Sequence, residues 1–181
     1  MITIAQTLAE ASQQLASRSA SPKLDAEQLL SHVLGQGRSY FYTWPERELS
    51  LVHQQQFHAL LNRRLHGEPL AYILGEREFW SLPLQVTHAT LIPRAETELL
   101  VEQALARLPE QQALRVADLG TGSGAIALAI AHERPLVQLV ATDIAADTLA
   151  VAQANAQRLK LYNVEFRLGD WCAALSGQFD L

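Results

Sequence analysis

Asp118-Leu119-Gly120-Thr121-Gly122-Ser123-Gly124 is the stretch that decides the fold, because its glycines separate an apolar run from a row of small residues. The run before it, Leu114–Leu119, has the length of a buried strand, and Ala125–His132 after it has the pattern of a helix. Glycine permits a tight turn and leaves no Cβ where a ligand must approach the backbone. Gly124 and Ala125 would let the helix pack closely on the sheet. The stretch therefore predicts a strand, a ligand-binding turn and a helix, whose free N–H groups suit a polar or anionic ligand.

Strand and helix continue to alternate beyond this loop. Further strands are expected at Val137–Thr142 and Val164–Leu168, with a helix at Ala145–Leu159 between them. Phe179-Asp180-Leu181 has the pattern of a fourth strand that begins. Alternation of this kind indicates βαβ units and a parallel sheet, so the second half of the chain is predicted to be an α/β domain.

The first part of the chain has a helical pattern instead. Apolar residues recur at steps of three and four, and capping and stop signals bound helices at 4–15, 22–34, 50–67 and 70–74. A short β-hairpin or an extended connector is expected from Phe79 to Val86, and Pro93 is expected to open another helix. These stretches predict a small helical bundle that precedes the α/β domain.

The composition excludes several classes of protein. The 181 residues are 49% apolar and 18% charged, which is ordinary globular usage and excludes disordered, collagen-like and coiled-coil chains. The net charge of -5 argues mildly against nucleic acid as a partner. No apolar run reaches the ~20 residues of a membrane span and the start lacks a signal-peptide pattern, so a cytoplasmic protein is expected. The lone cysteine, Cys172, excludes an internal disulfide, and the histidine spacing predicts no metal site.

A carboxylate ends the second predicted strand. Asp143 lies 23 residues beyond Gly120, where a carboxylate can accept hydrogen bonds from both ribose hydroxyls of a nucleoside cofactor. The strand, the glycine turn, the helix and this acid together predict a nucleoside-cofactor site. A role for Asp143 as the N-cap of the next helix stays open.

The identity of the cofactor depends on the residues around the loop. Gly120-x-Gly122-x-x-Ala125 also satisfies the dinucleotide fingerprint of NAD-dependent dehydrogenases. Asp118, however, would repel a pyrophosphate and would suit a cationic ligand. Asp-x-Gly-x-Gly-x-Gly resembles the S-adenosylmethionine loop of class I methyltransferases. In that family an acidic and an aromatic residue after the third strand contact adenine, as Asp170 and Trp171 would here; half-buried packing is the alternative for Trp171.

Several further stretches resemble one family, the bacterial peptide chain release factor glutamine methyltransferases. The residues that carry the resemblance are Ser21-Pro22-Lys23-Leu24-Asp25-Ala26-Glu27, Gly67-Glu68-Pro69-Leu70-Ala71-Tyr72-Ile73-Leu74-Gly75, Glu76-Arg77-Glu78-Phe79-Trp80, Leu91-Ile92-Pro93-Arg94 and Asp118 to Gly124. The resemblance implies an α/β protein in three parts. These are an N-terminal helical bundle domain at 1–75, a β-hairpin connector at 76–92, and at 93–181 the first half of a Rossmann-like class I methyltransferase domain with a parallel sheet.

The resemblance also implies a reaction and a set of site residues. The enzyme would transfer a methyl group from S-adenosylmethionine to the side-chain amide nitrogen of the glutamine in the Gly-Gly-Gln motif of a release factor, which the helical domain would contact. Asp143 would bind the ribose and Trp171 would form the adenine wall. The cofactor loop would consist of Gly120, Thr121, Gly122, Ser123 and Gly124.

Two positions in the resembling segments leave questions open. The family tends to have proline where this chain has Ala95, and the loss of that proline should matter little for the chemistry. Arg94 would either line the substrate pocket or form an ion pair with Glu98 four residues on.

The Asn-Pro-Pro-Tyr motif that carries catalysis in this family does not occur in the 181 residues. No catalytic residue is therefore assigned, and the chain is expected to be the inactive N-terminal portion of a longer enzyme. Two other functions stay open. One is methylation of adenine N6 in nucleic acid, and the other is binding of a release factor without catalysis.

Overall fold

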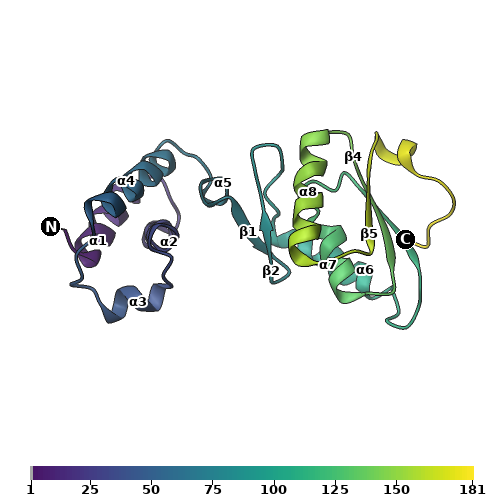
Figure 1. Ribbon diagram of the computed structural model, residues 1–181, viewed down its shortest axis with the longest axis horizontal. Helices are drawn as coiled ribbons and strands as arrows, with labels where there is room; N and C mark the ends of the chain where they lie inside the picture. Colours follow the sequence, from purple (N-terminus) through teal and green to yellow (C-terminus); the bar gives the residue numbers. More distant parts are fainter. Residues whose placement is uncertain (1) are drawn as a thin grey trace. The chain divides into compact units, whose positions relative to one another are not determined.

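The computed structural model describes residues 2–181, and the chain divides into two compact units at Leu74 and Gly75 (Figure 1). Met1, with which the predicted helical domain starts, lies outside the described residues. The division falls one residue before the predicted end of that domain. The hairpin, predicted as a separate connector, belongs to the second unit. No helix within residues 2–181 is both long enough and apolar enough to cross a membrane.

The first unit is a helical bundle, as the sequence predicts. Its helices are α1 (Ile4–Leu15), α2 (Pro22–Leu34), α3 (Arg38–Thr43), α4 (Leu51–Leu65) and α5 (Leu70–Leu74). The starts follow from local chemistry: Thr3 and Gln6 form a capping box on α1, and the Ser50 hydroxyl accepts a hydrogen bond from the backbone of His53 at the start of α4. The apolar faces meet in a core that includes Leu15, Leu29 and Phe57. Helix α3 is the one element of this bundle that the sequence does not predict.

The second unit begins with the hairpin of β1 (Glu76–Phe79) and β2 (Leu82–Gln85). The hairpin prediction is therefore correct and the extended connector is wrong. Trp80 and Ser81 form the two-residue turn, and both have positive φ, 52° and 59°. Positive φ at both turn residues matches the right-handed twist of a hairpin, although glycine or asparagine usually supplies it. The helix predicted to open at Pro93 starts later, as a 3-10 turn η1 (Ala95–Thr97) followed by α6 (Glu98–Leu105).

The α/β alternation that the sequence predicts is confirmed. The strands β3 (Arg115–Leu119), β4 (Gln138–Asp143) and β5 (Val164–Leu168) form a parallel sheet in that order, connected by α7 (Ala125–Glu133) and α8 (Ala146–Leu159). Figure 1 shows α6, α7 and α8 on one side of this sheet. Because side chains alternate along a strand, every second residue faces these helices. Val116, Leu139 and Ala141 do so and form the core with alanines of α7 and α8.

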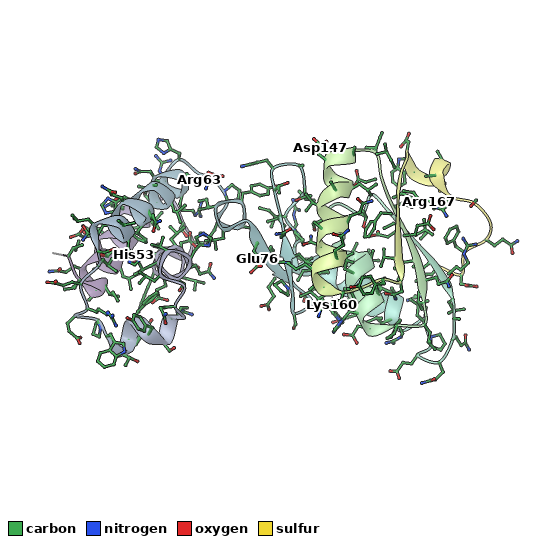
Figure 2. The ribbon with its side chains drawn as sticks, viewed as in Figure 1. His53, Arg63, Glu76, Asp147, Lys160 and Arg167 are labelled. Carbon is green, nitrogen blue, oxygen red and sulfur yellow. The ribbon has the colours of Figure 1, made fainter. Side chains whose placement is uncertain are left out.

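The chain beyond β5 folds back along the other face and edge of the sheet. Arg115 donates from Nη1 to the Gln178 carbonyl at 3.0 Å, and Arg167 donates from Nη1 to the Ala174 carbonyl at 3.1 Å (Figure 2 labels Arg167). At the edge of the sheet, the backbone N–H of Asp180 donates to the Arg115 carbonyl at 2.8 Å, and the backbone N–H of Ala117 donates to the Leu181 carbonyl at 2.9 Å. The residues predicted to begin a fourth strand thus pair with β3, although they form too short a ladder to be a strand.

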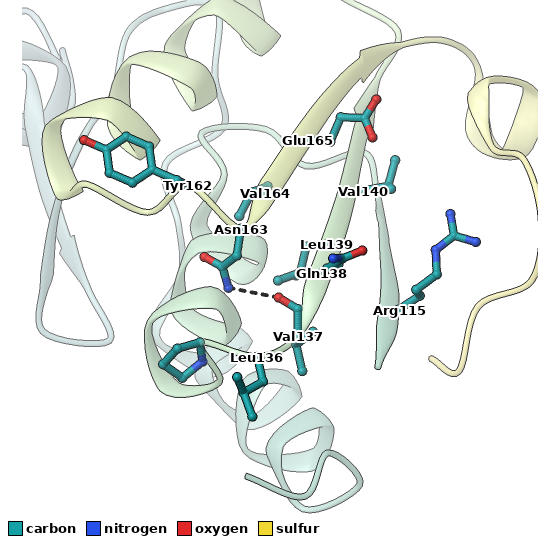
Figure 3. Close-up of a pocket in the computed structure, with 11 residues that line it drawn as sticks. Arg115, Leu136, Val137, Gln138, Leu139, Val140, Tyr162, Asn163, Val164 and Glu165 are labelled. Carbon is teal, nitrogen blue, oxygen red and sulfur yellow. Dashed lines mark hydrogen bonds between the residues drawn. The ribbon is translucent and has the colours of Figure 1, made fainter. Parts of the chain in front are cut away.

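A cavity of about 610 Å³ in the second unit lies at the amino ends of β4 and β5 (Figure 3). Val137, Tyr162 and Val164 line it, and Asn163 donates from Nδ2 to the Val137 carbonyl at 3.0 Å. Ligands of open α/β sheets bind at the carboxyl ends of the strands, which are the opposite ends. We therefore place the candidate site elsewhere.

Candidate functional site

A crevice lies where the carboxyl ends of the three parallel strands meet. It has a volume of about 110 Å³ and is lined by Leu119, Gly120, Asp143, Ile144, Gly169, Asp170 and Trp171. Leu119 ends β3, Asp143 ends β4 and Gly169 follows β5, so each strand contributes to it. The sheet itself therefore brings together residues that are far apart in the sequence, at the edge where α/β sheets bind ligands.

The glycine loop is held against the end of β4 by backbone hydrogen bonds. The N–H groups of Gly120 and Thr121 both donate to the Thr142 carbonyl at 2.9 Å, and Gly124 donates to the Thr121 carbonyl at 2.9 Å. Gly122 has φ of +60° and Gly124 has φ of +85°, conformations that side chains rarely adopt. The conformation of the loop backbone therefore requires glycine at these two positions, independently of any need of a ligand for close approach.

Gly124 also allows a close approach, in addition to the predicted packing of α7 on the sheet, where Ala125 shares the core with Val116 and Leu139. A Cβ at this position would lie 3.0 Å from Leu128 Cδ1 on α7 and 3.3 Å from Ala152 Cβ on α8. The tight contacts of such a Cβ would be with α7 itself and with α8. Gly124 lets the first turn of α7 pack against the middle of α8.

Asp143 connects β4, the glycine loop and the chain that follows. Its Oδ2 accepts from the Gly122 N–H at 3.0 Å, and its Oδ1 accepts from the Ala145 N–H at 3.0 Å. The N-cap residue of α8 is Ala145, so the open alternative that Asp143 caps this helix is wrong. A carboxylate has about four lone-pair sites, and the two backbone bonds leave others free. The half-buried carboxylate can therefore still accept hydrogen bonds from ligand hydroxyls at the crevice.

Asp118 does not line the crevice but a separate cavity of about 360 Å³, together with Ile126 and Leu181. Its Oδ2 accepts from the Thr121 hydroxyl at 2.7 Å. Burial raises the pKa of the Asp118 carboxyl above its ordinary value of 3.8, and the charge of Asp143 raises it further. Hydrogen bonds from the Thr121 hydroxyl and the Ala127 backbone lower the same pKa. Because Ala127 lies in the first turn of α7, whose N-cap Gly124 has no side chain, Asp118 supplies the carboxylate at that helix start.

Two exposed apolar side chains belong to the crevice. Trp171 is 72% exposed and Ile144 is 71% exposed, and both line the cavity. Trp171 has φ of +46°, and its carbonyl accepts from the Thr142 hydroxyl at 3.3 Å. Half-buried packing, the alternative for Trp171, is excluded by this exposure. The sequence analysis does not predict Ile144 as a site residue. The one sequence feature that could have indicated it is its position directly after Asp143, which ends the buried strand β4.

The structure brings together some of the predicted site residues. Gly120, Asp143 and Trp171 line the crevice, and Gly122 reaches it through its bond to Asp143. Thr121 and Ser123 are buried, 7% and 2% exposed, so any contact from them would come from the backbone. Their assignment to cofactor binding stays a prediction, as does that of the whole loop.

Arg94 is exposed and forms no ion pair within residues 2–181. The predicted alternative partner, Glu98, instead accepts a hydrogen bond from the Trp80 backbone N–H at 2.9 Å. The Arg94–Glu98 ion pair is therefore absent from the described chain. No cluster of three His, Cys, Asp or Glu side chains in the part of the chain that the structure describes could hold a metal ion.

Two family models match the chain, one in each unit. The model described as "PrmC N-terminal domain" matches residues 6–75, and that described as "Methyltransferase domain" matches residues 110–181. The two matches follow the two structural units, with the hairpin, η1 and α6 between them.

Curated relatives match both halves of the chain in one alignment. "Release factor glutamine methyltransferase" of Escherichia coli (strain K12) is 55% identical over 160 residues, which are 88% of this chain and 57% of that protein. The protein of the same name from Coxiella burnetii is 50% identical over 175 residues, 97% of this chain and 63% of that protein. The one from Shewanella oneidensis is 51% identical and covers 98% of this chain and 62% of that protein. The chain thus spans about three fifths of the length of these relatives.

Proposed function

We propose, from the premise that this chain belongs to the release factor glutamine methyltransferase family, that it binds S-adenosylmethionine and serves the methylation of release factors. The substrate would be the side-chain amide of the glutamine in a Gly-Gly-Gln motif. A protein with this substrate would work in the cytoplasm, where translation ends. The cofactor crevice of the second unit is the observation that carries the proposal.

The crevice residues suit the parts of S-adenosylmethionine. Asp143 has free acceptor sites for the ribose hydroxyls. Trp171 and Ile144 offer exposed apolar surface for adenine, and the Asp170 carboxylate can accept from its amino group. The site includes carboxylates and no lysine or arginine among its lining residues, which favours a cofactor without phosphates over a dinucleotide.

When bound, S-adenosylmethionine supplies a methyl group on a positively charged sulfur. Transfer of that methyl would form an N–C bond to the glutamine amide nitrogen as the S–C bond breaks with its electron pair going to sulfur, and the proton lost from the nitrogen would pass to the bulk solvent. An amide nitrogen is a weak nucleophile, so the reaction depends on positioning and on exclusion of water. The residues of this chain hold and orient the cofactor for that step.

Catalysis needs groups that hold the amide, which in the resembling family come from Asn-Pro-Pro-Tyr. Since this motif does not occur in the sequence, we propose that the 181 residues bind cofactor and release factor without transferring methyl. The helical unit would supply the contact with the release factor. Methyl transfer is proposed for a protein that carries this sequence together with the motif.

Calorimetry and a label-transfer assay test these proposals. We expect S-adenosylhomocysteine to bind the 181-residue chain with one site, and a release factor to bind it independently. Incubation with methyl-labelled S-adenosylmethionine and release factor should leave the release factor unlabelled. The same chain extended with the Asn-Pro-Pro-Tyr segment of a relative should label it, and should not label a release factor whose Gly-Gly-Gln glutamine is replaced by alanine. Labelling of DNA instead would favour the nucleic-acid alternative.

A further inference from the structure

Asn155 on α8 is a fully buried polar side chain that the proposed cofactor contacts do not use. Its side chain forms three hydrogen bonds, all of them with backbone groups. Its Oδ1 accepts from the Gln85 N–H at 2.7 Å, and its Nδ2 donates to the Gln85 carbonyl at 3.0 Å. The second proton of Nδ2 goes to the Ser123 carbonyl at 2.9 Å. One amide group therefore joins α8, the last residue of β2 and the end of the glycine loop at Ser123.

The contact with Ser123 falls where the loop has least support of its own. Gly122 and Gly124 on either side have positive φ and no side chains, so only hydrogen bonds fix their backbone. The N–H of Gly122 is held by Asp143 and that of Gly124 by Thr121. The carbonyl of Ser123, between these two glycines, accepts its hydrogen bond from Asn155.

Loss of this contact would leave the buried Ser123 carbonyl without its partner. An unpartnered carbonyl is costly in a dry interior, and the loop could satisfy it only by turning its peptide groups. A turn of the peptides at Ser123 would move the Gly122 N–H away from Asp143. The carboxylate proposed to bind the ribose would then lose one of the two bonds that orient it.

We infer that Asn155 is a positioning residue, which sets the glycine loop and through it Asp143 for the cofactor. The inference rests on the proposed function only for the identity of the ligand. The segment that follows β2, residues 86–92, contacts α8 separately, since the Thr148 hydroxyl donates to the Ala89 carbonyl at 2.6 Å. The effect of detaching this segment from α8 can therefore be measured separately from the effect of losing the contact between Asn155 and the loop.

The chain offers a matched control in Asn163. This asparagine also donates from Nδ2 to backbone carbonyls, those of Val137 at 3.0 Å, Ala131 at 3.3 Å and Arg134 at 3.4 Å (Figure 3 shows the first). It does so at the amino ends of the strands, away from the crevice. Asn163→Ala should lower stability in the same way as Asn155→Ala without touching the loop.

The test compares Asn155→Ala, Asn163→Ala and Thr148→Val in the 181-residue chain. Each variant is measured for its Tm, for its Kd toward S-adenosylhomocysteine and for amide hydrogen exchange at Gly122 and Gly124. We expect Asn155→Ala to weaken binding about tenfold and to speed exchange of both amides, with little change in the other two at a similar Tm. Asn155→Asp, of the same size but without the donor, should behave as Asn155→Ala does if the alanine variant does not fold.

Unchanged loop exchange in a folded Asn155 variant, or equal loss of affinity in Asn163→Ala at the same Tm, would overturn the inference. Absence of binding by the unsubstituted chain would instead count against the proposed function. The exchange rates still decide the positioning role in that case, because they need no ligand.

Discussion

Asp143 Oδ2 and the backbone nitrogen of Gly122 lie 3.0 Å apart, and their hydrogen bond joins the end of β4 to the glycine loop. The other oxygen of the same carboxylate holds Ala145 at the start of the connection to α8. One side chain thus orders the crevice and also presents acceptor sites to it. Its two roles can be separated by substitution.

Asp143→Ala removes both backbone contacts and the proposed ribose acceptor. We expect a loss of about 2 kcal/mol in the free energy of unfolding, because hydrogen bonds to a charged acceptor are lost, and no measurable cofactor binding. Asp143→Asn keeps the shape of the side chain and one acceptor oxygen. It should therefore lose less stability than Asp143→Ala, but its affinity for the cofactor should remain below that of the unsubstituted protein. Urea unfolding and calorimetry with S-adenosylhomocysteine measure the two effects.

Asp147 provides the control for this substitution. It is an exposed acid in the first turn of α8, close in sequence to Asp143 (Figure 2). Asp147→Ala should leave cofactor affinity unchanged. Equal losses of affinity in the two alanine variants would mean that general negative charge, rather than the carboxylate of Asp143, matters at the crevice.

Gly124→Ala tests the close packing of the loop on α8. The new Cβ would meet Leu128 and Ala152 at 3.0 and 3.3 Å in a backbone with φ of +85°. We expect a loss of about 3 kcal/mol, from backbone strain of about 1 kcal/mol and overpacking of about 2 kcal/mol. The measurement is the urea midpoint at constant slope.

Gly120→Ala separates the two contributions, because Gly120 has a similar φ of +74° but nothing lies within 4 Å of its Cβ position. It should lose only the strain of about 1 kcal/mol. Equal losses of stability in the two variants would mean that the neighbours of Gly124 shift to accommodate a Cβ without cost. Gly124 would then be needed only for its backbone conformation.

The sequence predicts best those features that have a long period or a specific loop chemistry. The alternation of strands and helices gives the parallel sheet, and the glycines with Asp143 give the crevice, because the fold class dictates where such residues meet. Helix α3 escapes prediction since its six residues are too few to show an amphipathic period. The turn at Trp80 and Ser81 escapes as well, because tertiary contacts such as the bond from Trp80 to Glu98 impose positive φ on residues that do not favour it.

Side-chain direction within the site is also beyond the sequence. Thr121 and Ser123 stand between glycines that ligands approach, yet both are buried by the packing of the loop on α7 and α8. Asp118 accepts a hydrogen bond from the Thr121 hydroxyl, which the sequence does not predict, and its suitability for a cationic ligand stays a prediction. Only the three-dimensional course of the loop decides which residues face the crevice.

Asp118→Asn should change the pH dependence of stability. Since burial raises the folded pKa of Asp118 above 3.8, the unfolded chain ionises first as the pH rises, and the stability of the protein falls between 3.8 and the raised pKa. Asparagine imitates the neutral carboxyl at every pH and can still accept from the Thr121 hydroxyl. The variant should match the unsubstituted protein below pH 3.8 and be at least as stable above it.

Urea unfolding of both proteins across this range gives the difference directly, since other carboxylates titrate alike in the two. A variant that becomes less stable than the unsubstituted protein as the pH rises would show that the helix start of α7 needs the charge of Asp118, and the burial of the carboxyl would then be the smaller effect.

Trp171→Ala should separate binding from stability. The side chain is 72% exposed and its φ of +46° is strained for a large residue, so its loss should change the free energy of unfolding by no more than about 0.5 kcal/mol. Cofactor affinity should fall roughly tenfold, because an aromatic wall for adenine is lost. The Kd from calorimetry and the urea midpoint together check this.

Fluorescence adds an independent readout, since the sequence has three tryptophans and only Trp171 lines the crevice. Cofactor binding should quench emission in the unsubstituted protein and in Trp44→Phe, which alters an exposed tryptophan of the helical unit. It should leave the emission of Trp171→Ala unchanged even at saturating cofactor. Quenching that survives in Trp171→Ala and disappears in another tryptophan variant would place the adenine away from the crevice at the ends of β3, β4 and β5.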